Sequence, residues 1–183
     1  MTLNFIRNFL SEGKSLKLKI DDLPYDLNDL APSISKETLN YHYENLAKTY
    51  AKRYNAGEGD ANFNEAGVYL HNILFQQYRE PAANNSPTGD ISKFIDEKFG
   101  SFNNFKKEFT KTAMSIQGSG WVYLSKTGEI KTIKNHEIKK DIVLLIDWWE
   151  HAWALDYQHD KQKYLDNQWK IINWDHINEQ STI

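Results

Sequence analysis

Apolar and aromatic side chains recur at helical spacing through the first part of the chain. Between Ser35 and Arg53 most are three or four residues apart, at Leu39, Tyr43, Leu46, Ala47 and Tyr50, which is the period of one helix face. Ser35 is a residue type that caps helix N-termini. The polar, glycine-containing stretch 55–60 ends this helix, and the pattern predicts a second helix over about 62–78. The two together predict an α-helical hairpin.

The second half of the chain mixes helical and strand-like patterns. Residues 81–89 contain two prolines and Gly89 and form the best candidate linker. After it, we expect helices over 90–99, 102–114 and 163–177, and strands over 120–125, 129–134 and 141–146. Lys126-Thr127-Gly128 has the composition of a hairpin turn.

These elements predict an α+β fold, an N-terminal α-helical hairpin followed by an α/β domain with a three-stranded antiparallel sheet flanked by helices. We expect an N-terminal extension at 1–22, a helical hairpin domain at 23–80 and a C-terminal α+β domain at 87–183.

Composition narrows the classes of function. The 183 residues include 22 Lys and Arg against 25 Asp and Glu, a net charge of −3, which argues against nucleic acid or an anionic membrane surface as a partner. The lack of cysteine excludes a disulfide scaffold and a thiolate metal site. The apolar patch Leu3–Ile6 is too short for a signal peptide, so we expect a cytoplasmic protein.

The most informative segment runs from Asp147 to Tyr157. Asp147 follows the β-branched, apolar run 142–146, and His151 comes four residues later, one helical turn on if the chain coils there. A carboxylate and an imidazole among tryptophans would make half of a first-row metal site. A capped or salt-bridged helix start is the alternative interpretation.

Two further histidines lie in the predicted hairpin. His42 falls in the first helix and His71 in the second. Either one alone would be an ordinary structural histidine. Together with Asp147 and His151 they give three imidazoles and one carboxylate, a set that leaves a position open for solvent or substrate. His159 and His176 have polar neighbours, so we expect them at the surface.

The segment 147–157 resembles the C-terminal metal motif of the iron/manganese superoxide dismutases. Other motifs of that family follow in order along 23–177: Leu23-Pro24-Tyr25, Leu30-Ala31-Pro32, Phe63-Asn64 with Ala66-Gly67, Pro87-Thr88-Gly89, Phe99-Gly100-Ser101-Phe102, Phe105-Lys106, Gln117-Gly118-Ser119-Gly120-Trp121 and Asn173-Trp174.

The resemblance implies a superoxide dismutase that converts superoxide to O₂ and hydrogen peroxide at one iron or manganese ion per subunit. It assigns the metal ligands to His42, His71, Asp147 and His151. It also gives roles to four further residues: Tyr50 at the pocket mouth, Trp121 and Trp149 in the pocket wall, and Glu150, which would cross a homodimer interface to orient the partner subunit's His151. An ordinary aromatic core is the alternative for the tryptophans.

The chain departs from the family pattern at the predicted gateway. Leu46 and Ala154 stand where the family usually has a histidine and a tyrosine that hydrogen-bond across the interface. Losing both partners strands no buried polar group, which predicts a rebuilt gateway. The hairpin is also short, since Tyr50 and His71 are 71 − 50 = 21 residues apart, and this favours a dimer over a tetramer.

A further departure concerns the choice of metal. Gly67 occupies the helix position of the family's solvent-bonding glutamine, and His136 occupies the loop position. We expect His136 to take over the glutamine's role, with an exposed loop histidine as the alternative. A histidine here slightly favours iron and leaves manganese open.

Two other functions remain to be weighed. A catalytically inactive structural relative should have lost metal ligands. A non-redox metal-binding protein would not need Tyr50, Trp121 and Trp149 at their family positions.

Overall fold

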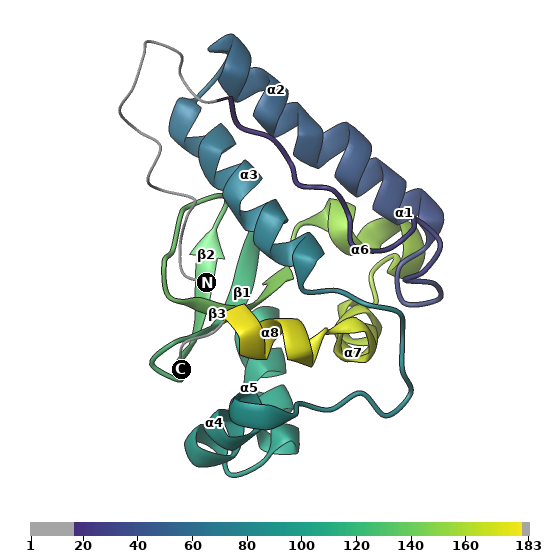
Figure 1. The fold of residues 1–183 in the computed structure, drawn as a ribbon, viewed down its shortest axis with the longest axis vertical. Helices are drawn as coiled ribbons and strands as arrows, with labels where there is room; N and C mark the ends of the chain where they lie inside the picture. Colours follow the sequence, from purple (N-terminus) through teal and green to yellow (C-terminus); the bar gives the residue numbers. More distant parts are fainter. Residues whose placement is uncertain (1–16, 181–183) are drawn as a thin grey trace.

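The computed structural model describes residues 17–180 (Figure 1). Most of the expected N-terminal extension, 1–22, therefore lies outside the described residues. Its last part, 17–22, is extended and runs between the two arms of the helical hairpin (Figure 1).

The first arm of the hairpin comprises α1 (Lys36–Asn40), a π-helix η1 (Tyr41–Ala47) and α2 (Lys48–Ala56). Ser35 caps its start, because the Ser35 hydroxyl accepts the Thr38 N–H at 3.1 Å. Gly57 ends it in the left-handed region, at φ 68°. The second arm, α3 (Ala61–Gln76), begins after Asp60, whose carboxylate accepts the Phe63 N–H at 2.7 Å.

The remaining elements form the second unit. They are α4 (Gly89–Phe99), α5 (Phe102–Met114), β1 (Gly120–Ser125), β2 (Ile130–Lys134), β3 (Ile142–Asp147), α6 (Glu150–Tyr157), α7 (Lys161–Ile171) and α8 (Trp174–Gln180). The three strands form one antiparallel sheet in the order β2-β1-β3. The predicted α+β fold class is therefore confirmed.

Three helices pack against the sheet. Helix α5 packs on β1 and β2, while α3 and α8 contact β3. Strands β1 and β3 are almost entirely buried, as their apolar sequences require. Within the described residues, no helix is long and apolar enough to cross a membrane.

The single helix predicted over 163–177 is wrong. Helix α7 ends at Ile171, Ile172 is extended with ψ 127°, and α8 starts at Trp174. Residues 77–79 explain the break, since Ile172 forms an antiparallel bridge with Tyr78, and the Asn173 N–H donates to the Gln77 carbonyl at 2.8 Å. A long-range backbone pairing replaces the helical hydrogen bonds at this point.

Candidate metal centre

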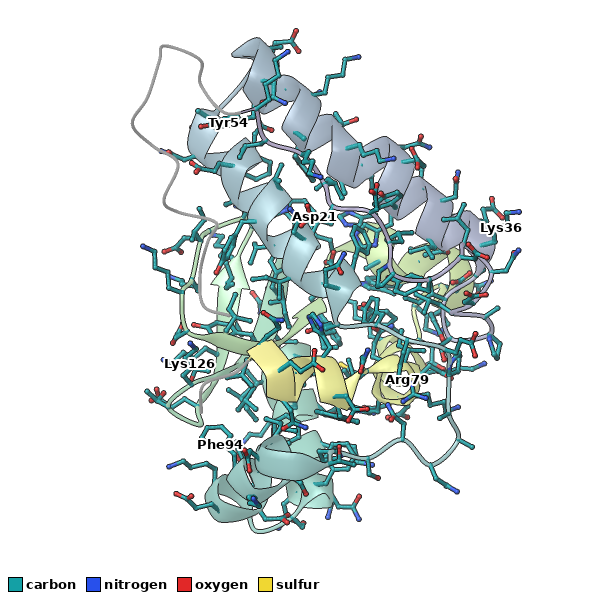
Figure 2. The ribbon with its side chains drawn as sticks, viewed as in Figure 1. Asp21, Lys36, Tyr54, Arg79, Phe94 and Lys126 are labelled. Carbon is teal, nitrogen blue, oxygen red and sulfur yellow. The ribbon has the colours of Figure 1, made fainter. Side chains whose placement is uncertain are left out.

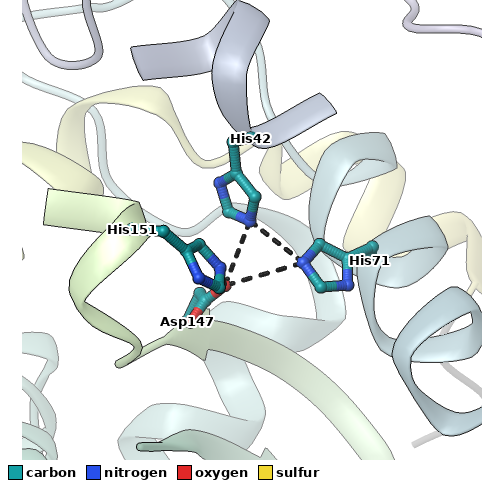
Figure 3. Close-up of side chains that lie close together, drawn as sticks. All are labelled: His42, His71, Asp147 and His151. Carbon is teal, nitrogen blue, oxygen red and sulfur yellow. Dashed lines mark hydrogen bonds and ion pairs between the residues drawn. The ribbon is translucent and has the colours of Figure 1, made fainter. Parts of the chain in front are cut away.

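The four predicted ligands come from four elements and meet in one place (Figure 3). His42 lies on η1, His71 on α3, Asp147 at the end of β3 and His151 in the first turn of α6. Each offers one ligand atom, and these atoms all lie within 4.8 Å of one another. Residues far apart in sequence thus form one polar cluster.

The distances show how closely the donor atoms converge. Asp147 Oδ2 lies 3.2 Å from His42 Nε2, 3.2 Å from His151 Nε2 and 3.9 Å from His71 Nε2. The Nε2 atoms of His42 and His71 are 3.0 Å apart. Three imidazole nitrogens and one carboxylate oxygen directed at a common point are a donor set suited to a first-row metal ion such as iron or manganese.

Burial controls the protonation of the cluster. Burial lowers the pKa of His42 and, more strongly, that of His71. Burial by itself would raise the pKa of Asp147, but the adjacent His151 and His42 hold it well below its usual range. His42 and His71 are therefore neutral and Asp147 is ionised at neutral pH, and metal binding needs these forms.

Hydrogen bonds outside the cluster orient two of the ligands. The His71 Nδ1–H donates to the Gly67 carbonyl at 2.7 Å, which leaves Nε2 free as a ligand atom. The Asp147 carboxylate accepts the Trp149 N–H at 2.8 Å, and its main-chain carbonyl accepts the Tyr164 hydroxyl at 2.9 Å. Asp147 is thus held at both its side chain and its backbone.

The strand that carries Asp147 is also supported along its outer edge. Because β3 is the last strand in the order β2-β1-β3, one of its edges has no partner strand in the described part of the chain. The Gln77 side chain occupies this edge: its amide nitrogen donates to the Leu145 carbonyl, and its amide oxygen accepts the Leu145 N–H. A side chain from the end of α3 thereby fixes the edge strand two residues before Asp147.

The backbone around His42 was not foreseen from the sequence. The helical period predicted one regular helix over 35–53, but Tyr41–Ala47 is a π-helix. Segments of this kind are rare and occur often at functional sites. The wider turn lies within the segment that bears His42 and precedes Tyr50, which lies on α2.

Aromatic rings enclose the cluster. The ring centroid of His71 lies 5.1 Å from that of Trp121 and 5.5 Å from that of Tyr50, while Trp149 lies 5.7 Å from His151. Trp121 is fully buried and Trp149 partly buried. All three predicted pocket residues therefore lie against the ligands.

Sequence reasoning missed two further aromatic neighbours. Phe75 lies 5.1 Å from His42 and 5.7 Å from His71 between ring centroids, and it is fully buried. Phe63 stacks on His136 at 4.5 Å. Phe75 lies four residues after His71 on α3, and this helical spacing was the signal that could have identified it.

His136 is not an exposed loop residue. Asn135 has a left-handed φ of 54° at the end of β2, a conformation that asparagine tolerates better than most residues. The chain turns there, and His136 is only 8% exposed. Neither ring nitrogen has a hydrogen-bond partner among the described residues. Burial lowers the pKa of His136 to about 4, so its ring is neutral at physiological pH and carries one N–H.

Gly67 gives His136 and Tyr50 the space they occupy. A Cβ atom at position 67 would lie 2.8 Å from His136 Nδ1 and 2.9 Å from Tyr50 Cγ. Both distances are below any normal van der Waals contact. The observed position of His136 therefore requires a residue without a Cβ atom at position 67.

The remaining predicted site residues lie toward the surface. Glu150, the first residue of α6, is exposed, and its neighbour His151 is the most accessible of the four ligands, with 12% of its side chain exposed. Leu46 and Ala154 are partly buried. Of the other histidines, His159 is exposed as expected, while His176 is partly buried on α8.

Comparisons with known proteins agree with this geometry. The family model "Iron/manganese superoxide dismutases, alpha-hairpin domain" matches residues 17–86, and "Iron/manganese superoxide dismutases, C-terminal domain" matches residues 87–180.

Similar proteins carry related names. "Superoxide dismutase [Fe]" of Bacteroides fragilis is 35% identical over 180 residues, covering 84% of this chain and 93% of the relative. "Superoxide dismutase [Mn/Fe]" of Porphyromonas gingivalis is 36% identical over 179 residues, with the same coverage of 84% and 93%. "Superoxide dismutase [Fe]" of Babesia bovis is 31% identical over 190 residues, covering 90% and 96%. The chain belongs to the iron/manganese superoxide dismutase family.

Proposed function

We propose that this protein converts superoxide to O₂ and hydrogen peroxide at one iron or manganese ion held by His42, His71, Asp147 and His151. The observation that supports this is the convergence of four ligand atoms within 4.8 Å, three of them on buried residues. A bound ion would supply the one-electron oxidation and reduction by which two superoxide anions and two protons become O₂ and H₂O₂. The protein supplies the metal ligands, an enclosure of aromatic side chains and polar groups that hydrogen-bond in the site.

Two polar side chains beside the ligands, Tyr50 and His136, are suited to hydrogen-bond with the reacting groups. Burial, followed by the nearby Asp147 charge, raises the pKa of Tyr50 to about 12, so its hydroxyl stays protonated at neutral pH. Neutral His136 carries one N–H and lies 4.7 Å from the Tyr50 ring and 5.8 Å from the His71 ring. We assign both to hydrogen bonding with solvent and substrate in the site.

The alternatives find less support. An inactive structural relative would be expected to lack ligands, and here all four donor residues are present and directed at one another. A non-redox metal site would not require the aromatic enclosure of Tyr50, Trp121 and Trp149. The metal itself stays open between iron and manganese, with iron slightly favoured by His136.

We further propose a homodimer in which Glu150 hydrogen-bonds to the partner subunit's His151. Glu150 is exposed beside the most accessible ligand. Two large apolar side chains that lie close to ligands in sequence, Tyr41 and Leu155, are 41% and 56% exposed. They line one groove together with Asn40 and Asn45. A two-fold axis would pair the two glutamates and histidines reciprocally.

Substitution of single ligands tests the assignment. We expect His42→Ala and Asp147→Ala to lose most bound metal and all measurable superoxide consumption, whereas His159→Ala, which removes an exposed imidazole outside the site, should behave as wild type. Metal content by elemental analysis and superoxide consumption are measured on the same samples. Full metal retention in His42→Ala or Asp147→Ala would refute the ligand set.

A further inference from the structure

We propose that residues 17–22, here termed the N-terminal strap, fix the separation of His42 and His71 through two positioning residues, Tyr43 and Asn72. Each of these directly follows a histidine ligand, and both hydrogen-bond to the backbone of Asp21. The inference rests on the proposed function, because it concerns how firmly those ligands hold an ion.

Asp21 links the two arms of the hairpin. Its carbonyl accepts the Tyr43 hydroxyl at 3.2 Å, and its N–H donates to Asn72 Oδ1 at 2.9 Å. The Asn72 amide nitrogen also donates to the Lys19 carbonyl at 3.1 Å. Figure 2 labels Asp21 between the two arms of the hairpin.

Helix geometry explains why the residues after the ligands reach the strap. Successive side chains of an α-helix point roughly 100° apart. On α3, His71 is directed at the metal cluster, so Asn72 is turned toward a different side, where the strap lies. On the other arm, the π-helix η1 also points consecutive side chains in different directions, since His42 contacts Asp147 and Tyr43 contacts Asp21.

The strap is anchored in the hydrophobic core through Ile20, next to the ligand-bearing segments. Ile20 is 6% exposed and belongs to the hydrophobic core, and Tyr43 is also 6% exposed. The Phe75 ring packs against Tyr43 at 5.5 Å and against His42 at 5.1 Å between centroids. A shift of Asp21 relative to either arm would therefore disturb a close-packed region next to both ligands.

The chain provides a matched control on the same strap. Asn55, at the end of α2, accepts the Leu18 N–H at 2.9 Å and donates to the Leu18 carbonyl at 2.8 Å. It is the same residue type as Asn72 and makes the same number of bonds to the strap, but it does not adjoin a ligand. Any effect on metal release that Asn72→Ala has and Asn55→Ala lacks therefore reflects the position of Asn72 beside His71.

The experiment compares Asn72→Ala, Tyr43→Phe, their double variant and Asn55→Ala as manganese-loaded proteins. The rate of metal release to excess EDTA and the visible absorption of the manganese(III) form are measured, and unfolding of the metal-free proteins reports stability. We expect Asn72→Ala and Tyr43→Phe each to release manganese about tenfold faster and to shift the absorption band. The double variant should release it no faster than the faster single variant, because both act through Asp21.

Asn55→Ala should release manganese at the wild-type rate with an unchanged band, even where its metal-free form loses as much stability as Asn72→Ala. Equal acceleration in Asn55→Ala, wild-type release in both single variants, or multiplied effects in the double variant would each overturn the proposal. Tyr43→Phe removes only one oxygen, so it keeps the test available if Asn72→Ala fails to fold. If wild type holds iron but not manganese, the same release comparison is made on the iron-loaded proteins. Failure of wild type to hold one ion of either metal per subunit would instead refute the proposed function.

Discussion

The substitution Gly67→Ala tests whether this glycine is needed for steric reasons. Helix propensity predicts that the substitution raises stability, whereas a steric clash predicts that it lowers stability. In an unconstrained helix interior, replacing glycine by alanine stabilises by about 1 kcal/mol. Here the new Cβ would lie 2.8 Å from His136 Nδ1 and 2.9 Å from Tyr50 Cγ. Overpacking of this kind costs about 1–3 kcal/mol. Tyr50 Cγ is the root of its ring and cannot swing away as a flexible side-chain end could, so the steric cost should win.

We therefore expect Gly67→Ala to lose about 1 kcal/mol of net stability, which corresponds to roughly 2–4 °C in Tm for a chain of this size. Because the displaced groups are His136 and Tyr50, activity should fall about tenfold or more at full metal loading. Thermal unfolding and superoxide consumption measure the two effects. His136→Ala in the same background removes one of the two contacts and should recover part of the lost stability. A Gly67→Ala variant that is more stable than wild type would refute the steric reasoning.

Three further predictions concern the surroundings of the ligands. Glu150→Ala should weaken both self-association and metal retention, the latter about 10–100-fold, as measured by sedimentation and elemental analysis; a wild type that sediments as a monomer at micromolar concentration would contradict the proposed interface. His136→Gln should change the ratio of activity between the iron-loaded and manganese-loaded proteins, while His136→Ala should lower activity with either metal; an unchanged ratio and rate in both would reduce His136 to a packing residue. Burial lowers the pKa of His136 from 6.5 to about 4, so the stability it contributes in the metal-free protein is present above pH 6.5 and is lost as pH falls toward 4. Denaturant unfolding of metal-free wild type should accordingly lose more stability over this range than His136→Gln does, and parallel pH profiles would contradict the assignment.

Periodicity was sufficient to predict the hairpin and the sheet. The helical spacing of Leu39, Tyr43 and Tyr50 and the β-branched run 142–146 report local patterns of burial. The ligand residues could be selected because three histidines and one aspartate together form a metal-ligand set, and because the order of motifs resembles one family. Their convergence within 4.8 Å could be seen only in the structure, because the tertiary fold brings the four elements together.

Features set by long-range contacts could not be predicted in this way. The π-helix over Tyr41–Ala47 carries no distinct hydrophobic period. The break after Ile171 arises from the pairing of Ile172 with Tyr78, nearly a hundred residues away in sequence. The bonds of Gln77 to Leu145 and of Asn72 to Asp21 likewise use polar side chains whose partners only the tertiary structure supplies.

Titration of metal-free protein with iron, and separately with manganese, relates catalysis to occupancy of the four-ligand site. Bound metal per subunit and the rate of superoxide consumption are determined on each sample. We expect no activity without metal and, with at least one of the two ions, a linear rise that ends at one ion per subunit. Activity that persists in fully chelated protein, or full occupancy by both ions without superoxide consumption, would contradict dismutation at this site.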